Sequence, residues 1–452
     1  MHIKITGLLA FAALFQTAIA QRSDIQYFRH YDQRGINVFE TTKTDTIIYE
    51  GLKLRIGANF TQGFQSLKHS NNSGVKLYDL GTGFPLAMAN LNIDVQLADG
   101  VRLNLVSYMS SHHHNEMWVK GGYIQVDKVG FLNSEFLNKL WKNLTLKVGH
   151  MEINYGDAHF RRSDGGNTFW NPFMESNIMD AYTTEIGSEL YFQKSGWIAM
   201  LGMTNGEIQG SVTRDSDRGA SMYGKLGYDH KFGDQNRVRI TGSFLNKTSS
   251  ISGTLYGGDR TGSNYQFAME PANATLSGNA FSGRLNPNFK DNVTSFMINP
   301  FVKLGGLELF GTYEIAQGKN AVENGEVQYD AAADETTKFG KLKNRQFTQL
   351  AGDVLYRFGT RAQFYAGARY NLVKGEQVFG QTTTTATAGG INQGKRVDIS
   401  VDRFALAAGW FITRNILLKG EYVTQRYTDY PTGNILQGGK FDGFVMQGIV
   451  AF

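Results

Sequence analysis

Cysteine is absent from the 452 residues, which excludes a disulfide framework, a thiolate metal site, a thiol nucleophile and a lipid-bearing cysteine near the amino terminus. Proline is scarce, with 6 residues against 53 glycines, a balance that favours many strands joined by tight bends. Beyond the first 20 residues there is no run of about 18 apolar residues, so no transmembrane helix is predicted. The net charge of +5 is small and dispersed, which argues against a nucleic-acid partner.

The chain is instead rich in residues that alternate between polar and apolar. From 90 to 97 one face carries polar side chains and the other carries apolar ones, namely Asn90, Asn92, Asp94 and Gln96 against Leu91, Ile93, Val95 and Leu97. This period of two indicates a β-strand. Residues 101–105 repeat the pattern, and only Asp99 and Gly100 lie between the two segments, which predicts a tight hairpin.

Similar segments predict sixteen strands, at 51–66, 86–98, 101–110, 117–128, 143–155, 183–194, 196–205, 220–232, 236–248, 293–304, 306–317, 345–358, 361–374, 396–411, 415–428 and 440–452. Their connections alternate between short and long, as the periplasmic turns and extracellular loops of a membrane barrel do. The connection 129–142 is long for a turn, and we expect a helical turn around Phe136 to Trp141. Fourteen or eighteen strands are also possible, since 249–292 could hold a further pair around Asn264 to Met269.

Both ends of the chain agree with an exported barrel. Residues 1–20 have an early Lys4, an apolar stretch and the small residues Ala18 and Ala20, which predict a signal peptide cleaved near Ala20. The final strand ends on Phe452, an aromatic carboxyl terminus typical of outer-membrane barrels. We therefore expect the barrel to occupy 51–452. The segment 21–50 is either a periplasmic tail or a partial plug of the lumen.

With these features the chain resembles the general porins of bacterial outer membranes, and the segment VGHMEINYGDAHFRRSDGG resembles porin-like proteins of Bacteroidota. The resemblance implies an all-β, transmembrane antiparallel barrel, in contact with outer-membrane lipid and usually assembled as a homotrimer. It also implies that Phe452 is the signal read by the barrel insertion machinery. The interior of a sixteen-stranded barrel is too wide for side chains to fill. We therefore expect a water-filled channel for passive diffusion of small hydrophilic solutes.

In this family an inward-folded third extracellular loop narrows the channel. The matching stretch is 156–182, and its candidate constriction residues are Asp157, His159, Arg161, Arg162, Asp164 and Glu175. Adjacent Arg161 and Arg162 facing carboxylates would create a transverse field that filters ions by sign. The alternative is a surface loop with solvated charges.

Strand phase also predicts which charges face the lumen. The cations opposite the apolar faces are Arg55, Arg102, Lys147, Arg237, Arg239, Arg357, Arg361 and Lys419, mostly near the short turns. Fewer acidic residues share those faces, namely Asp94, Glu308, Asp353 and Glu421. A weak preference for anions follows. The alternative is that these cations are water-facing strand ends near phospholipid headgroups.

Other features give little support to catalysis or to metal binding. His112, His113 and His114 are adjacent, but consecutive side chains on an extended segment point in opposite directions. No nucleophile, zinc, nucleotide or dinucleotide motif occurs. We therefore expect no enzyme activity, no cofactor and no metal. Two alternatives to a passive channel stay open: a plugged or gated barrel for a specific hydrophobic or saccharide substrate, and a structural barrel in an envelope complex.

Overall fold

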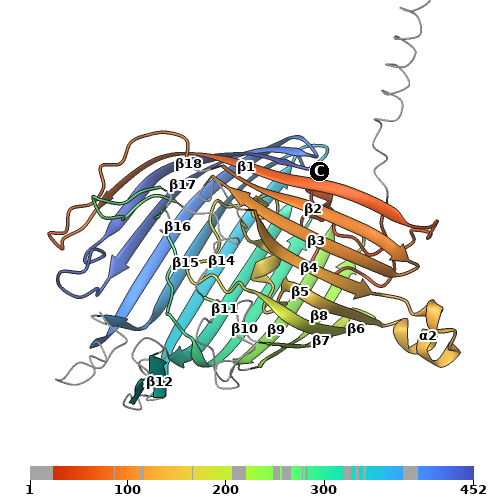
Figure 1. Cartoon of the computed structure of the whole chain (residues 1–452). Coiled ribbons are helices and arrows are strands. Elements are labelled where there is room, and N and C mark those ends of the chain that lie inside the picture. Colours follow the sequence, from red (N-terminus) through yellow and green to blue (C-terminus); the bar gives the residue numbers. More distant parts are fainter. Residues whose placement is uncertain are drawn as a thin grey trace, which may run out of the picture.

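The computed structural model describes residues 24–452 except 86, 112–116, 165, 206–219, 248–254, 257–265, 277, 280–282, 320–326, 331–334, 339–342 and 380–394. The fold is a closed barrel of sixteen antiparallel strands (Figure 1). The first strand, β1 (Lys53–Ser70), pairs with both β2 (Ala87–Ala98) and the last strand, β18 (Lys440–Ala451), and this pairing closes the barrel. No barrel edge is left to expose unpaired backbone groups to lipid.

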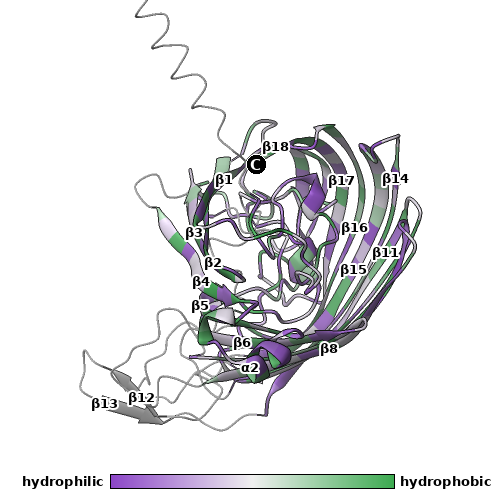
Figure 2. Ribbon diagram, turned by 90° about the vertical axis from the view of Figure 1, so that its right-hand side faces the viewer, coloured by the Kyte–Doolittle hydropathy of each residue, from purple (hydrophilic) through white to green (hydrophobic). Residues whose placement is uncertain are grey.

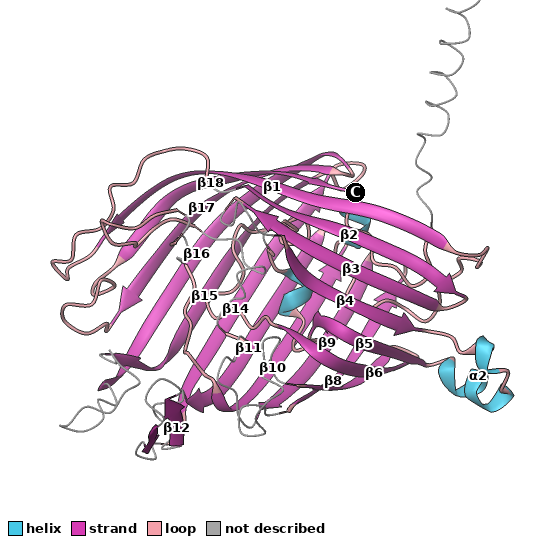
Figure 3. Cartoon of the chain, viewed as in Figure 1, coloured by secondary structure: helices cyan, strands magenta, loops and turns pink. Residues whose placement is uncertain are grey.

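The remaining barrel strands follow one another around the wall (Figure 3). They are β3 (Val101–Ser110), β4 (Trp118–Val126), β5 (Leu144–Glu152), β6 (Thr184–Lys194), β7 (Trp197–Thr204), β8 (Ser221–Phe232), β9 (Asn236–Lys247), β10 (Asp291–Leu304), β11 (Leu307–Lys319), β14 (Arg345–Phe358), β15 (Phe364–Phe379), β16 (Lys395–Thr413) and β17 (Ile416–Thr428). A separate hairpin, β12 (Val327–Asp330) with β13 (Glu335–Lys338), lies between β11 and β14.

The described residues contain few helices, and all of them are short. They are η1 (Gln33–Gly35), η2 (Gly130–Leu132), α2 (Glu135–Trp141) and η3 (Ala158–Arg161). The expected helical turn between the fourth and fifth strands is therefore confirmed as α2. Within the described ranges, no helix is both long enough and apolar enough to cross a bilayer.

The predicted count of sixteen strands is confirmed, and most boundaries agree within three residues. The described part of 249–292 contributes no barrel strand before Asp291, while Asn264 lies outside the described residues. One strand boundary differs from the prediction and changes where a charged residue lies. Residues 361–363 were expected in a strand but belong to the turn before β15, where Ala362 has a φ of 49°.

The two faces of the wall follow the predicted alternation. On β2 the polar side chains of Asn90, Asn92 and Asp94 point inward and are buried, while Leu91 and Ile93 point outward. This is the reverse of a soluble sheet, because the solvent outside a membrane barrel is lipid. The view along the barrel in Figure 2 shows the ring of strands with the inward-folded segments inside it.

Aromatic rings mark the barrel end that carries the short turns. On its outer surface Tyr356, Phe358, Phe364 and Trp410 form a stacked row, with successive ring centroids 6.4, 5.6 and 6.2 Å apart. All four are exposed or half-exposed toward the surroundings of the barrel. Such a row is typical of the girdle that lies at a membrane interface, and short turns are typical of the periplasmic side.

We predict that Phe452→Ser lowers the yield of assembled barrel far more than the stability of barrel already assembled. The backbone N–H of Phe452 donates to the carbonyl of Ala58 at 3.0 Å and its carbonyl accepts from Ala58 at 3.1 Å, and both bonds survive the substitution. The ring is 47% exposed, so the folded state loses only about 1 kcal/mol of contact. The heat-modifiable band in isolated outer membranes measures yield, and urea unfolding measures stability.

Val450→Ser is the matched control, because Val450 also points outward from β18. It should leave the yield close to that of the parent. If both variants assemble as well as the parent, Phe452 carries no assembly signal.

Candidate functional site

The connection between β5 and β6, residues 153–183, crosses the lumen and is fastened to the opposite wall. The backbone N–H of Met174 donates to Glu421 Oε2 at 2.8 Å, and that of Met179 donates to Gln349 Oε1 at 2.9 Å. The N–H of Ile178 donates to Asn371 Oδ1 at 2.6 Å. The three acceptors belong to β17, β14 and β15. Inward-pointing side chains of the wall therefore satisfy backbone groups that an unstructured loop would leave to water.

Lys419 on β17 likewise satisfies backbone carbonyl groups of this loop. Its Nζ donates to the carbonyl oxygens of Thr168, Asn171 and Phe173, at 3.0, 3.0 and 2.8 Å. The phase of the strand predicted that Lys419 faces the lumen, and it does, but it lies buried under the loop rather than in open water.

Much of the N-terminal segment, residues 25–40, also lies inside the barrel. The backbone N–H of Gln26 donates to Gln96 Oε1 at 2.8 Å, and Asn104 Nδ2 donates to the hydroxyl of Tyr31 at 3.2 Å. Farther along, Asn37 Nδ2 donates to Glu308 Oε1 at 2.6 Å. These contacts join the segment to β2, β3 and β11. The sequence left open whether this segment is a periplasmic tail or a partial plug, and that choice stays a prediction.

A buried cluster of charges joins both inward segments to β8 and β9. Asp157 accepts hydrogen bonds from Lys225 Nζ at 2.8 Å, from Arg239 Nε at 2.7 Å and from Thr241 Oγ1 at 2.8 Å. Glu40 accepts from Arg239 Nη2 at 2.7 Å and lies 3.3 Å from Lys225 Nζ. Burial alone would raise the pKa of Asp157, but Arg239 and Lys225 outweigh it and lower that pKa below its usual value.

The other charged residues expected at the constriction are also paired. Arg161 lies 3.6 Å from Glu308 and 3.9 Å from Asp353, while Arg162 binds Asp180 of the same loop at 2.5 Å. Glu175 lies 2.6 Å from Arg403 of β16. These pairs are buried. Arg161, Arg162, Asp157 and Glu175 therefore fasten the loop instead of projecting into open water.

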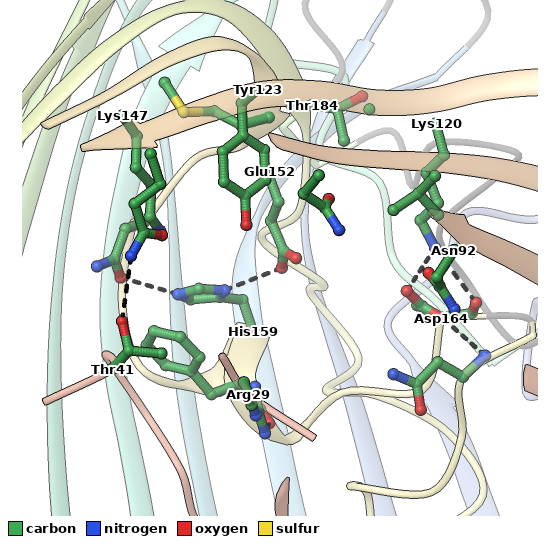
Figure 4. A pocket seen from close by; sticks show the side chains of 18 of the residues that line it. Arg29, Thr41, Asn92, Lys120, Tyr123, Lys147, Glu152, His159, Asp164 and Thr184 are labelled. Carbon is green, nitrogen blue, oxygen red and sulfur yellow. Dashed lines mark hydrogen bonds and ion pairs between the residues drawn. The ribbon is translucent and has the colours of Figure 1, made fainter. Parts of the chain in front are cut away.

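A cavity of about 200 Å³ remains between the loop, the N-terminal segment and the wall made by β2 to β6. Figure 4 shows that Lys120, Tyr123 and Lys147 point into it from the wall, and His159 and Asp164 from the loop. Of the candidate constriction residues, only His159 and Asp164 line this cavity.

The acids and cations of the cavity are not matched one to one. His159 Nδ1 lies 2.9 Å from Glu152 Oε1, and Asp164 is ion-paired with Lys120. Lys147 donates instead to the hydroxyl of Tyr191 at 3.2 Å. The carboxylate nearest to it in the described part of the chain, that of Glu189, is 4.0 Å away.

Arg102, like Lys147, has no carboxylate at hydrogen-bonding distance in the described part of the chain. It donates to Gln125 Oε1 at 2.6 Å and lies 4.0 Å from Asp94. Lys147 and Arg102 flank the ring of Tyr123, at 5.6 and 5.7 Å from its centroid. The β3 to β5 wall of the cavity is therefore positively biased.

The remaining lumen-facing cations expected from strand phase are partly neutralised. Arg55 lies 3.5 Å from Asp94, Arg357 lies 2.9 Å from Glu308, and Arg237 and Arg239 share Asp229. Arg361 is exposed in the turn before β15, because that strand begins three residues later than expected. Its assignment to the lumen is therefore corrected.

Sequence reasoning did not single out Lys225, Glu40 or Asn37. Lys225 was recognisable in principle, because it alternates with the outward-facing Gly224 and Leu226 on β8. The segment that holds Glu40 and Asn37 has no strand period, so the sequence gives no sign of their partners. His112 to His114 lie outside the described residues. In the described part of the chain no three histidine, aspartate or glutamate side chains gather as a metal site would require.

Comparison with known proteins identifies the fold. No protein-family model and no curated protein matches the chain. Among solved structures, the anion-selective porin from Comamonas acidovorans is similar over 89% of this chain and 100% of its own, at 11% identity and a TM-score of 0.51. The fold is thus that of an outer-membrane porin barrel.

Two further structures give lower scores. OmpF of Salmonella typhi covers 90% of this chain and 99% of its own, at 13% identity and a TM-score of 0.46. The trimer form of OmpT from Vibrio cholerae covers 89% and 100%, at 11% identity and a TM-score of 0.47. The expected likeness to porins is confirmed at the level of the fold, and the closer likeness to proteins of Bacteroidota stays a prediction.

We predict that Asp157→Ala destabilises the protein by about 3 kcal/mol, because it leaves the buried Lys225 and Arg239 with too little negative charge. Urea unfolding in detergent micelles, followed by tryptophan fluorescence, measures the change. Asp99→Ala is the control, since Asp99 forms an exposed pair with Lys128 at 2.8 Å and its loss should cost less than about 1 kcal/mol. Equal losses for the two variants would contradict the fastening role of Asp157.

We predict that the loop 153–183 is held more firmly at pH 5 than at pH 8. Burial raises the pKa of Glu175 to about 7, although Arg403 opposes this. A carboxyl group whose pKa is raised on folding stabilises the folded state most at pH values below its ordinary pKa of 4.5. This stabilisation is lost as the pH rises through about 7.

Hydrogen exchange of the peptide that contains Met174, corrected for the intrinsic effect of pH, measures this difference. Glu175→Gln removes the titrating group and should abolish the difference. Identical protection of the parent loop at both pH values would count against the assignment.

Proposed function

We propose that the chain is an outer-membrane channel through which small hydrophilic solutes diffuse passively along the β2 to β6 side of the lumen. One observation carries the proposal. The barrel is closed, its inner wall is polar, and a polar cavity remains beside that wall where the inward segments do not fill the lumen. We propose no catalytic step and no cofactor, since selection by size and charge requires neither.

The length of the cavity supports this proposal. On β4 it is lined from Lys120 to Gln125, which at 3.3–3.4 Å per residue corresponds to roughly 17 Å along the strand. The apolar band of such barrels is about 25 Å tall. Because the strands of such barrels tilt by about 35–45°, this length corresponds to roughly 13 Å along the membrane normal, so about half of the crossing is hollow and polar.

The charges of the cavity favour anions weakly. Arg102 and Lys147 lack a carboxylate at hydrogen-bonding distance, whereas Asp164 and Glu40 have close cationic partners and Glu152 lies against His159. We assign the narrow section to His159 and Asp164, and a fastening role to Asp157, Arg161, Arg162 and Glu175. Because the cavity is narrow, each unneutralised charge acts on a passing ion through little water.

The rest of the proposal concerns export and assembly. Residues 1–20 would be removed near Ala20, the insertion machinery would recognise Phe452, and the barrel would reside in the outer membrane as a homotrimer surrounded by lipid. Ala366 and Ala368 on the outer face of β15 support close approach of a second barrel wall. Native mass spectrometry in mild detergents tests this, and a monomer in every detergent would refute the trimer.

A second candidate function is a gated barrel for a specific substrate. It is favoured by the two inward segments, which are held through the paired charges around Asp157 and Glu40 rather than lying loosely in the lumen. In that case the segment 24–50 would have to leave before a hydrophobic or saccharide solute could pass. A structural barrel in an envelope complex is the third candidate.

Single-channel recording of the purified full chain in a planar bilayer separates these functions. Frequent, stable steps of small conductance, unaffected by added solutes, are expected for the passive channel. Rare steps, or steps that one substrate class blocks, would favour the gated barrel. A silent bilayer, with protein shown to be inserted, would favour the structural role and refute the channel.

We predict that Lys147→Gln shifts the zero-current potential under a salt gradient toward cations, because it removes a cavity charge that no close carboxylate offsets. Arg361→Gln is the control and should cause a much smaller shift, since Arg361 is exposed in a turn. The difference should shrink at about 1 M salt, where the screening length is about 3 Å. Equal shifts for both variants would show that the ions pass elsewhere.

A further inference from the structure

The connection between β4 and β5 carries an apolar surface that the barrel does not cover. Residues 127–143 join the two strands at the short-turn end and contain η2 and α2 (Figure 1). Four of its large apolar side chains are exposed: Phe131 by 58%, Leu132 by 50%, Phe136 by 74% and Leu140 by 45%. Exposed apolar side chains that gather in this way mark an interaction surface.

The local structure of this connection is well defined. Asn133 has a left-handed backbone, with a φ of 50°, and Ser134 caps α2 by accepting a hydrogen bond from the N–H of Leu137 at 3.4 Å. Trp141 Nε1 donates to the carbonyl of Val126 at 3.2 Å, which ties the end of the helix to β4. The carbonyl of Asn143 accepts from the N–H of Gln193 at 2.8 Å, which ties the connection to β6.

The helix is apolar over a wider arc than its contact with the barrel requires. At 3.6 residues per turn, Phe136 and Leu140 share one side, Leu137 and Trp141 lie on the adjacent side, and Asn138 lies opposite Phe136. Leu137 and Trp141 are half-buried and face the barrel. The side of Phe136 and Leu140 is left without a protein partner among the described residues.

The position of this surface indicates what covers it. It directly follows the ends of β4 and β5, whose outward-facing Ile124 and Val148 are exposed to lipid. On the neighbouring strand pair, Phe192 and Trp197 are exposed at the same short-turn end. The apolar face of α2 therefore continues the lipid-facing surface of the wall at the level where aromatic residues meet the headgroups.

The charges around the helix fit the same location. Exposed lysines border the apolar side chains, while Glu135 is the only acid within α2. These lysines are Lys139, Lys142 and Lys194; Lys128 is half-exposed and pairs with Asp99 at 2.8 Å. Lysine stems lie along apolar surface while their ammonium groups reach phosphates. A short amphipathic helix with this distribution lies in the plane of a membrane interface.

We propose that residues 130–142 form an interfacial anchor, in which Phe131, Leu132, Phe136 and Leu140 enter the periplasmic leaflet and the flanking lysines bind phosphate-bearing headgroups. The anchor would fix the depth of the barrel in the membrane on the side next to the cavity. It does not depend on whether the barrel conducts.

The absence of native cysteine allows a direct test with single spin labels. The variant Phe136→Cys is labelled and placed in nanodiscs of phosphatidylethanolamine and phosphatidylglycerol. Accessibility to oxygen, which concentrates in lipid, is compared with accessibility to a water-soluble nickel chelate. Leu226→Cys, on the outer face of β8, is the lipid control, and Asn138→Cys is the water control. Heat-modifiable mobility confirms that each variant is folded.

The expected ratio of oxygen to nickel accessibility at position 136 is close to that at 226 and several-fold higher than that at 138. Leu140→Cys should behave like Phe136→Cys. A ratio at 136 equal to that at 138 would place the helix in water and overturn the proposal. Low accessibility of position 136 to both reagents would show a protein contact, such as a second copy of the chain, and would also overturn it.

Discussion

Charge pairing inside a low-dielectric lumen is the constraint on which the rest of this structure depends. The inner wall of a sixteen-stranded barrel is polar because water normally fills it. Here two segments displace most of that water, so the charges they cover must find protein partners or destabilise the fold. The cluster of Asp157, Glu40, Arg239 and Lys225 meets this requirement, with cations from the wall and one acid from each segment.

The cavity is the part of the lumen that this packing leaves open. The outer half on the side of β9 to β17 holds an apolar core in which Met174, Ile178, Met179, Tyr256 and Phe289 pack together. On the side of β2 to β6 the wall instead carries amides and cations, and among the described residues no comparable cluster of apolar side chains fills it. Polarity, more than the position of the loop in the sequence, therefore determines which part of the lumen stays open.

The sequence predicted the wall far better than its contents. Period-two alternation is a local property, so strand number, strand faces and the inward direction of Lys419 follow from neighbouring residues alone. The contacts of the inward segments are not local. Glu40 meets Arg239 across 199 positions, and Lys419 meets Thr168 across 251. No pattern near these residues specifies such partners, so the neutralisation of the lumen cations could not be foreseen.

One strand boundary was predicted wrongly. The sequence predicts a strand from 361 and so places Arg361 in the lumen, but the left-handed backbone at Ala362 belongs to the turn before β15. Arg161 and Arg162 are predicted to face carboxylates, and the sequence does not specify that these come from β11, β14 and the loop itself. Their place at a constriction stays a prediction.

The central claim is that solutes pass beside the segment 24–50 while it stays in place. The N–H of Gln33 donates to the carbonyl of Arg414 at 3.0 Å, which brings the two backbones close enough for a disulfide between Gln33→Cys and Arg414→Cys. Single-channel conductance of this double variant, recorded before and after reduction, is the most direct measurement. The account predicts the same small steps in both states. Silence when oxidised and large steps after reduction would show that the segment is a gate and would contradict the account.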